Sequence, residues 1–204
     1  MRNIAIFGSG SGTNAENIIK YFAKSDRIRV AVVLSNKKEA GIHERTRNLG
    51  VPSFTFSFVE FKEGVLILDK LAACHVDFVV LAGFLQLISP VIINAYPNRI
   101  INIHPALLPK FGGKGMYGAH VHESVVAAKE MQTGITVHYV NERYDEGTVI
   151  FQAVCPVLPD DTAEDVATKV HALEYEHYPR VIENLLLFKH KEHKETTKNT
   201  KRNA

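Results

Sequence analysis

The sequence has few cysteines, no apolar run of membrane-spanning length and no large excess of charge of one sign. Its two cysteines, Cys74 and Cys155, are far apart, lie in apolar surroundings and show neither CxxC nor metal-ligand spacing. We therefore expect reduced core residues in a cytoplasmic protein rather than a disulfide framework. No apolar stretch approaches the roughly 20 residues of a transmembrane helix. The strand pattern that begins at Ile4 leaves no room for a signal peptide, and we expect no membrane association.

The small net charge of +2 conceals a basic C-terminus. Residues 189–204 contain six Lys or Arg and two Glu, a net charge of +4, which leaves −2 for residues 1–188. This tail is polar and poor in apolar residues, so we expect it to be disordered. It is either a solvated terminus or a tether to nucleic acid or membrane. Because the remaining chain is not basic, nucleic acid is not expected as the main partner.

Apolar runs alternate with helical patterns through the first half of the chain. We expect strands at residues 4–7, 30–34, 53–56, 78–82 and 100–103, and helices at 14–23, 42–49 and 61–73. Strands that are apolar throughout and alternate with helices are typical of a mostly parallel sheet with helices on both faces. The sequence therefore predicts an α/β protein built on such a sheet.

The second half follows a different pattern. Residues 134–140 alternate apolar and polar side chains, and residues 148–157 follow after a polar turn, which predicts an antiparallel pair. A last helix is expected from Thr162 towards Phe188, opened by a capping box of Thr162 and Asp165. Pro179 is expected to break or kink this helix. No repeat or linker divides residues 1–188, which we expect to form one domain.

A glycine-rich segment, GSGSGTN at residues 8–14, joins the first strand to the first helix. Glycines allow a ligand close to the backbone, and a helix N-terminus favours an anion. No Lys follows Gly12, so the segment is not a Walker A motif, and Thr13 occupies the third glycine position of the dinucleotide fingerprint. The segment favours a single phosphate monoester; the alternative is a tight turn capped by Thr13 or Asn14.

Two polar side chains end the strand expected at residues 100–103. Asn102 and His104 are two residues apart and so project from the same face, and Pro105 stops the strand. An amide can donate to a developing oxyanion, and an imidazole can donate or accept a proton near neutral pH. A histidine before proline can equally be structural, so the segment alone leaves both interpretations open.

Three further polar residues are weaker candidates. Asp145 lies in a turn before Gly147, where an aspartate needs no other reason than the turn itself. A carboxylate near an imidazole would also orient that ring and raise its pKa. His120 and His122 are spaced like a metal pair, but no third ligand is evident, and a polar helix start explains them better than zinc.

Taken together, five segments make the chain resemble the phosphoribosylglycinamide formyltransferases over nearly all of residues 1–188. They are SGSGTN (9–14), VLAGF (80–84), NIHPALLPK (102–110), GITVH (134–138) and YDEG (144–147). The resemblance implies a Rossmann-like formyltransferase fold. It also implies transfer of the formyl group of 10-formyltetrahydrofolate to the amine of 5-phosphoribosylglycinamide in purine biosynthesis.

The resemblance further implies roles for single residues. The catalytic set would be Asn102, His104 and Asp145. The acceptor substrate would be held by its phosphate and ribose, through Gly12, Thr13, Asn14 and Glu174. The folate would lie along Leu85, Gln86, Leu87 and Ile88 on one side and along Asn102, Glu142, Arg143 and Tyr144 on the other. The family also has a basic residue that contacts the folate, for which Lys62 is the nearest candidate. No metal is implied.

The implied mechanism is direct transfer. The amine attacks the formyl carbon, Asn102 and protonated His104 donate to the oxyanion, and Asp145 raises the pKa of His104 and helps to move the proton through water. Two departures from the family are visible: Ala106 replaces a common Ser, and residues 111–118 are longer and richer in glycine. We expect this segment to form a mobile flap.

Three alternatives and one open property remain at this point. The chain could be another folate-dependent formyltransferase or a formyltetrahydrofolate hydrolase. It could also be a non-catalytic phosphate-binding module, which would leave the Asn102 and His104 pair unexplained. A monomer and a homodimer are both compatible with the sequence.

Overall fold

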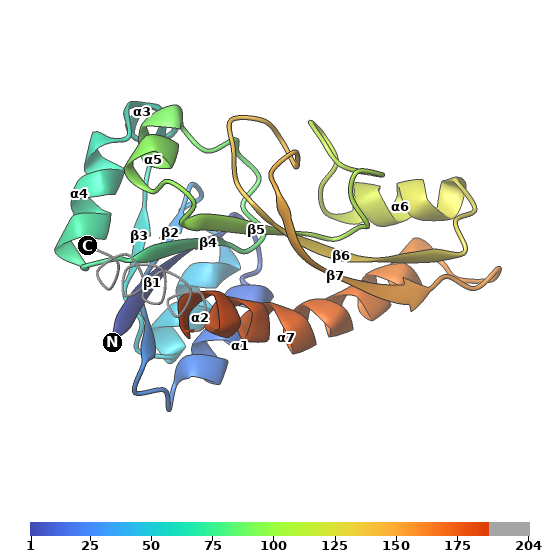
Figure 1. Ribbon diagram of the computed structural model, residues 1–204, viewed down its shortest axis with the longest axis horizontal. Helices are drawn as coiled ribbons and strands as arrows, with labels where there is room; N and C mark the ends of the chain where they lie inside the picture. Colours follow the sequence, from blue (N-terminus) through green and yellow to red (C-terminus); the bar gives the residue numbers. More distant parts are fainter. Residues whose placement is uncertain (188–204) are drawn as a thin grey trace, which may run out of the picture.

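A computed structural model describes residues 1–187, which form a seven-stranded sheet with helices on both faces (Figure 1). The strand order is β3-β2-β1-β4-β5-β6-β7. The first five strands pair in parallel, and the last two join the edge in antiparallel pairs. Their bounds are β1 Arg2–Phe7, β2 Ile28–Ser35, β3 Ser53–Thr55, β4 Phe78–Leu81, β5 Ile100–His104, β6 Gln132–Tyr139 and β7 Val149–Pro156. The predicted fold class, including the antiparallel pair, is confirmed.

The alternating side chains of β1 divide the core into two halves. Ile4 and Ile6 face one apolar cluster, while Ala5 and Phe7 face the other. Helices α1 (Thr13–Phe22), α2 (Gly41–Asn48), α6 (Ala119–Ala127) and α7 (Ala163–Leu187) contribute to the first cluster. Helices α3 (Phe58–Glu63), α4 (Val65–Ala73) and α5 (Pro90–Ala95) contribute to the second. A strand that is buried on both faces must be apolar at every position, which explains the continuous apolar runs in the sequence.

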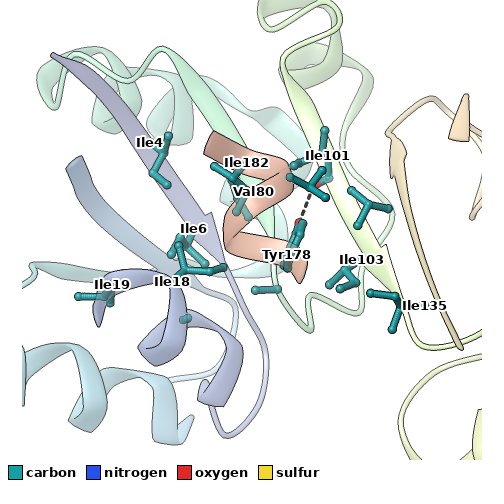
Figure 2. Close-up of a cluster of buried hydrophobic side chains, with 14 of the residues drawn as sticks. Ile4, Ile6, Ile18, Ile19, Val80, Ile101, Ile103, Ile135, Tyr178 and Ile182 are labelled. Carbon is teal, nitrogen blue, oxygen red and sulfur yellow. Dashed lines mark hydrogen bonds between the residues drawn. The ribbon is translucent and has the colours of Figure 1, made fainter. Parts of the chain in front are cut away.

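Helix α7 is joined to the centre of the sheet by a buried phenol. Tyr178 has no exposed surface, and its hydroxyl donates to the carbonyl oxygen of Leu81 at 2.9 Å. The carbonyl oxygen of Ile101 lies 3.5 Å from the same hydroxyl (Figure 2). The side chain thereby ties the last helix to the end of β4 and to the adjacent strand β5, which carries the polar residues described below.

Three helical predictions differ from the structure. The helix predicted at residues 61–73 is two helices, because Gly64 adopts a left-handed φ of 79° between α3 and α4. The short helix α5 was not predicted. Of the break or kink expected at Pro179, the break is wrong: α7 runs through this buried proline from Ala163 to Leu187. The buried neighbours Tyr178 and Val181 pack into the core, which offsets the lost backbone hydrogen bond.

The last helix begins with the expected capping box. The main-chain N–H of Thr162 donates to Asp165 at 2.9 Å, and the N–H of Asp165 donates to the Thr162 hydroxyl at 3.2 Å, as in a capping box. Cys155 is buried, Cys74 is half-buried, and both are free thiols. Among residues 1–187, no helix combines the length and apolar character needed to cross a membrane. The basic tail at residues 189–204 lies outside the described residues.

Candidate active site

A cavity of about 700 Å³ lies at the carboxyl ends of the central strands. Its wall includes the loop after β1 (residues 10–14), the end of β4 and the segment that follows it (residues 81–88), and the end of β5 (residues 102–105). The chain turns from β1 towards β2 on one side and returns to β4 on the other, and ligands of open α/β sheets bind at such a switch point. The volume is in the usual range for a small-molecule site.

The glycine-rich loop is held against the start of α2. Gly12 has a left-handed φ of 79°, and a Cβ at this position would lie 2.6 Å from the Cα of Ile42. Arg45 donates from Nε to the carbonyl oxygen of Ser11 at 2.9 Å and pairs with Glu16. Within the described part of the chain, no side-chain hydrogen bond caps the start of α1. The N–H groups of that turn are therefore free for an anion, and the alternative of a turn capped by Thr13 or Asn14 loses its basis.

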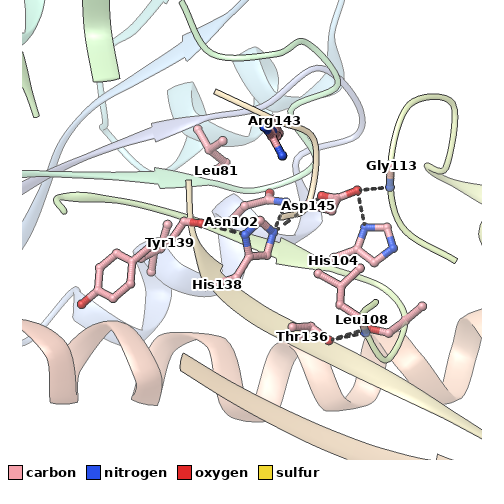
Figure 3. A network of polar contacts seen from close by, with 12 residues as sticks. Leu81, Asn102, His104, Leu108, Gly113, Thr136, His138, Tyr139, Arg143 and Asp145 are labelled. Carbon is pink, nitrogen blue, oxygen red and sulfur yellow. Dashed lines mark hydrogen bonds and ion pairs between the residues drawn. The ribbon is translucent and has the colours of Figure 1, made fainter. Parts of the chain in front are cut away.

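Strand β5 presents Asn102 and His104 on one face, and β6 extends this polar face. In the antiparallel register Asn102 is opposite His138 and His104 is opposite Thr136. Nδ1 of His138 lies 2.9 Å from the carbonyl oxygen of Tyr139 and so carries a proton. Nε2 of the same ring accepts from the Asn102 amide at 3.2 Å (Figure 3). One amide N–H of Asn102 is used in this way, and the second is left for a ligand.

The turn after β6 brings Asp145 to the same place. Its Oδ2 lies 3.5 Å from Nδ1 of His104, and its Oδ1 lies 3.6 Å from Nε2 of His138 (Figure 3). Oδ2 also accepts from the main-chain N–H of Gly113 at 2.9 Å. The other ring nitrogen of His104, Nε2, donates to the carbonyl oxygen of Phe111 at 2.7 Å. Both nitrogens of His104 therefore face oxygen acceptors, an arrangement that suits an imidazolium.

Burial opposes that charge. Desolvation lowers the pKa of His104 and outweighs the raising effects of the Asp145 carboxylate and the Phe111 carbonyl, so the pKa lies below its ordinary 6.5. Asp145 does raise the pKa of His104, as expected, but desolvation has the larger effect and the pKa is lowered overall. Burial raises the pKa of Asp145, yet His138, His104 and the Gly113 N–H together bring it below its ordinary value. Asp145 is thus held as a carboxylate.

A second polar cluster lies at the far end of the cavity, between α1 and α7. Glu174 is buried, and its Oε2 accepts from the Asn14 amide at 2.8 Å and lies 2.8 Å from Nδ1 of His171. The hydrogen bond with Glu174 raises the pKa of His171. His122 on α6 is buried beside this cluster, whereas His120 points outward and pairs with Glu123. Residues 1–187 contain no group of three potential metal ligands.

Most of the residues expected to bind folate line the same cavity. Leu85, Gln86, Leu87 and Ile88 follow β4 on one wall, and Arg143 and Tyr144 come from the turn that carries Asp145. The side-chain oxygen Oε1 of Gln86 is buried and has no partner among the described residues. Glu142 and Lys62 are not part of the lining; Lys62 is exposed at the end of α3, where its carbonyl oxygen accepts from Ser89 at 3.1 Å.

Sequence reasoning missed four participants. His138 and Thr136 could have been found by pairing the alternating strand with β5. Thr136 fixes the turn after His104, because its hydroxyl donates to the Ala106 carbonyl at 2.7 Å and accepts from the Leu108 N–H at 3.0 Å. His122 was considered only as half of a metal pair and His171 gave no local signal, since only the packing of α6 against α7 brings the two to the cavity.

Comparisons with known proteins agree with this geometry. The family model described as formyl transferase matches residues 2–182. A phosphoribosylglycinamide formyltransferase of Haemophilus influenzae is 35% identical over 187 residues, which cover 89% of this chain and 86% of the relative. A chloroplastic one of Vigna unguiculata is 41% identical, and the match covers 90% of this chain but 61% of the relative. The chain thus spans less than two thirds of that plant relative. A crystal structure of the enzyme from Bacillus halodurans superposes with a TM-score of 0.83 at 37% identity, covering 92% of this chain and 96% of the other.

Proposed function

The chain belongs to the formyl transferase family, and we propose that it transfers the formyl group of 10-formyltetrahydrofolate to the amine of 5-phosphoribosylglycinamide. The observation that carries this proposal is the meeting of Asn102, His104 and Asp145 in one cavity with a free helix N-terminus. An oxyanion site and a phosphate site within a single cavity fit the transfer of an acyl group to a phosphorylated amine. The relatives that are named phosphoribosylglycinamide formyltransferases support the same acceptor.

The acceptor would lie along the length of the cavity. Its phosphate meets the N–H groups of Gly12, Thr13 and Asn14, where the dipole of α1 favours an anion. Its ribose hydroxyls donate to Glu174, whose buried carboxylate already binds Asn14 and His171 through Oε2. The glycinamide then extends towards His104, so the amine reaches the formyl carbon.

The folate would enter from the opposite wall. The pterin carries several N–H donors, and the buried, unpartnered Oε1 of Gln86 is an acceptor that such a donor would satisfy. The main chain of residues 85–88 supplies further donors and acceptors, while Arg143 and Tyr144 close the other side. Lys62 and Glu142 lie outside the lining, so we assign Lys62 to the exposed glutamate end of the folate and Glu142 to the rim.

Oxyanion stabilisation is the main contribution of the chain to the chemistry. Attack of the amine on the formyl carbon converts its carbonyl oxygen into an oxyanion, which the second N–H of Asn102 meets while His138 fixes the amide. One such donor is worth about 3 kcal/mol in the transition state. His104 becomes the second donor once its Nε2–H leaves the carbonyl oxygen of Phe111.

Proton transfer completes the reaction. The attacking amine loses one proton and the departing N10 of the folate gains one, so no net acid is consumed. Asp145 is held as a carboxylate and can pass this proton through water, while it also stabilises a charged His104. This path requires neither a metal nor a covalent enzyme intermediate.

Two rival activities use the same core. Hydrolysis of the formyl-folate needs only water as acceptor, and a different formyltransferase needs another amine. The free N–H groups at α1 and the buried Glu174 favour a phosphorylated sugar as acceptor over water. A non-catalytic phosphate-binding module would have no use for Asp145 held as a carboxylate between two histidines.

The test measures deformylation of 10-formyltetrahydrofolate with and without phosphoribosylglycinamide. We expect rapid deformylation only with the acceptor present, together with one formylated product for each folate released. Deformylation at the same rate without acceptor would identify a hydrolase. If the protein neither binds the folate nor transfers the formyl group, the result would support the non-catalytic module. His104→Ala should lower kcat far more than it changes either KM.

A further inference from the structure

His122 is a buried polar residue that the proposed function has not yet used. It lies on α6 with 4% of its surface exposed and lines the cavity. Its Nδ1 is completely buried and has no hydrogen-bond partner among the described residues. No hydrogen bond among residues 1–187 engages Nε2 either, and because Nδ1 is sealed, Nε2 is the ring nitrogen that a ligand in the cavity can meet.

The surroundings of the ring decide which nitrogen carries the proton. A proton on the sealed Nδ1 would be an unsatisfied donor, which costs more than an unsatisfied lone pair. The neutral ring therefore carries its proton on Nε2, the nitrogen left to meet the cavity. Burial lowers the pKa of His122, His171 and His104 lower it further, and Glu174 opposes them. The residue is thus a neutral N–H donor.

His122 lies between the two halves of the proposed acceptor site. Its ring centroid is 6.3 Å from that of His171, which binds Glu174. His104, at the reacting end, is also close enough to affect the pKa of His122. Between a ribose at Glu174 and an amine at His104, the substrate has one strong acceptor, the carbonyl oxygen of its amide.

On the basis of the function proposed above, we propose that Nε2–H of His122 donates a hydrogen bond to the amide carbonyl oxygen of the glycinamide. The residue is then a specificity determinant for the acceptor. It selects an amide between the sugar and the amine, and it holds the chain extended towards the formyl carbon. It takes no part in proton transfer.

Three variants and a control test the assignment. His122→Phe removes both nitrogens, His122→Gln restores an N–H near the Nε2 position, and His122→Asn places one near Nδ1 instead. His120→Phe makes the same change on the same helix at a position 63% exposed and outside the lining. We expect His122→Phe to raise the KM for phosphoribosylglycinamide about tenfold, the cost of one lost hydrogen bond, with the KM for folate unchanged. Glutamine should recover most of this loss and asparagine little.

Infrared spectroscopy supplies a readout that a purely structural role would not change. The substrate carries ¹³C at its amide carbonyl, and its stretching frequency is recorded when bound without folate. We expect a lower frequency on the wild type than on His122→Phe, with the His120→Phe value equal to the wild type. Equal frequencies and equal KM values on the wild type and His122→Phe would overturn the assignment while leaving the proposed function intact. A wild type that neither formylates nor binds this acceptor would overturn both.

Discussion

Replacing Asp145 by asparagine removes one charge and little else. The carboxylate lies 3.5 Å from Nδ1 of His104 and 3.6 Å from Nε2 of His138, and its side chain is 11% exposed. Asparagine has the same shape, and its amide oxygen can still accept from the N–H of Gly113. The substitution therefore tests the charge of Asp145 rather than its packing.

The distance sets the size of the effect. Two unit charges 3.5 Å apart attract each other by roughly 5 kcal/mol at an effective dielectric constant of about 20. Because 1.36 kcal/mol corresponds to a factor of ten, losing this attraction to a charged His104 in the transition state would slow the reaction by up to about three powers of ten. We expect kcat to fall about 1,000-fold, and each KM to change less than about threefold because Asp145 is not proposed to bind the ground state.

Two measurements separate this mechanism from a general loss of structure. Steady-state kinetics give kcat and both KM values, and NMR of the ring protons follows the titration of His104. The pKa of His104 is below 6.5 in the wild type, and it should fall further in Asp145→Asn, since the substitution removes a cause that raises it. Residual activity should therefore increase towards acid pH, where more of the ring is protonated.

Glu146→Gln is the matched control. Glu146 lies in the same turn, its side chain is 58% exposed, and its partner is Arg143 on the surface. This variant should keep a near-normal kcat, and any effect through Arg143 should appear only in the KM for folate. A kcat of Asp145→Asn within tenfold of the wild type, or a His104 pKa that stays unchanged or rises, would refute the assigned electrostatic role.

Three further predictions concern the frame of the site. Gly12→Ala should raise the KM for the acceptor at least tenfold, because a Cβ at a φ of 79° would lie 2.6 Å from the Cα of Ile42; a normal KM would contradict the phosphate site. Tyr178→Phe should lower the free energy of unfolding by about 1–2 kcal/mol in urea titrations, because the carbonyl of Leu81 loses its buried donor. The pKa of His122 is below 6.5 when folded, so its contribution to stability is present above pH 6.5 and is lost as pH falls below it. His122→Gln should therefore lose less unfolding free energy than the wild type between pH 7 and pH 5; an equal loss would argue against the lowered pKa.

The sheet could be predicted because its strands are buried on both faces. Runs such as residues 4–7 and 78–81 must be apolar where both faces are covered, and that pattern needs no tertiary information. The interruptions in the helices depended on tertiary structure. Pro179 has a helix-breaking tendency, but it is buried in α7 among residues that pack into the core. Local propensity is a weak prior where packing of this kind decides the outcome.

The candidate site divides in the same way. The two-residue period of a strand is enough to place Asn102 and His104 together. The arrival of Asp145 beside them depends on a turn in which this residue adopts a left-handed φ of 56°. The histidines of α6 and α7 meet only through the packing of two helices distant in sequence. The resemblance to a family supplied the roles that spacing could not.

The resting contacts of His104 connect the chemistry to the segment of residues 111–118. The Phe111 carbonyl accepts a hydrogen bond from Nε2 of His104. The Gly113 N–H donates to Oδ2 of Asp145, the same oxygen that faces Nδ1 of His104. Phe111 and Gly113 have positive φ values of 55° and 98°, so this end of the segment is in a conformation that few residues adopt. Nε2–H cannot donate fully to the oxyanion and to Phe111 at once, so the proposed mechanism requires this contact to break, through movement of the Phe111 carbonyl or of the His104 ring. In this mechanism Phe111, in the proposed flap of residues 111–118, accepts the hydrogen bond from His104 Nε2–H until the acceptor and the folate are bound.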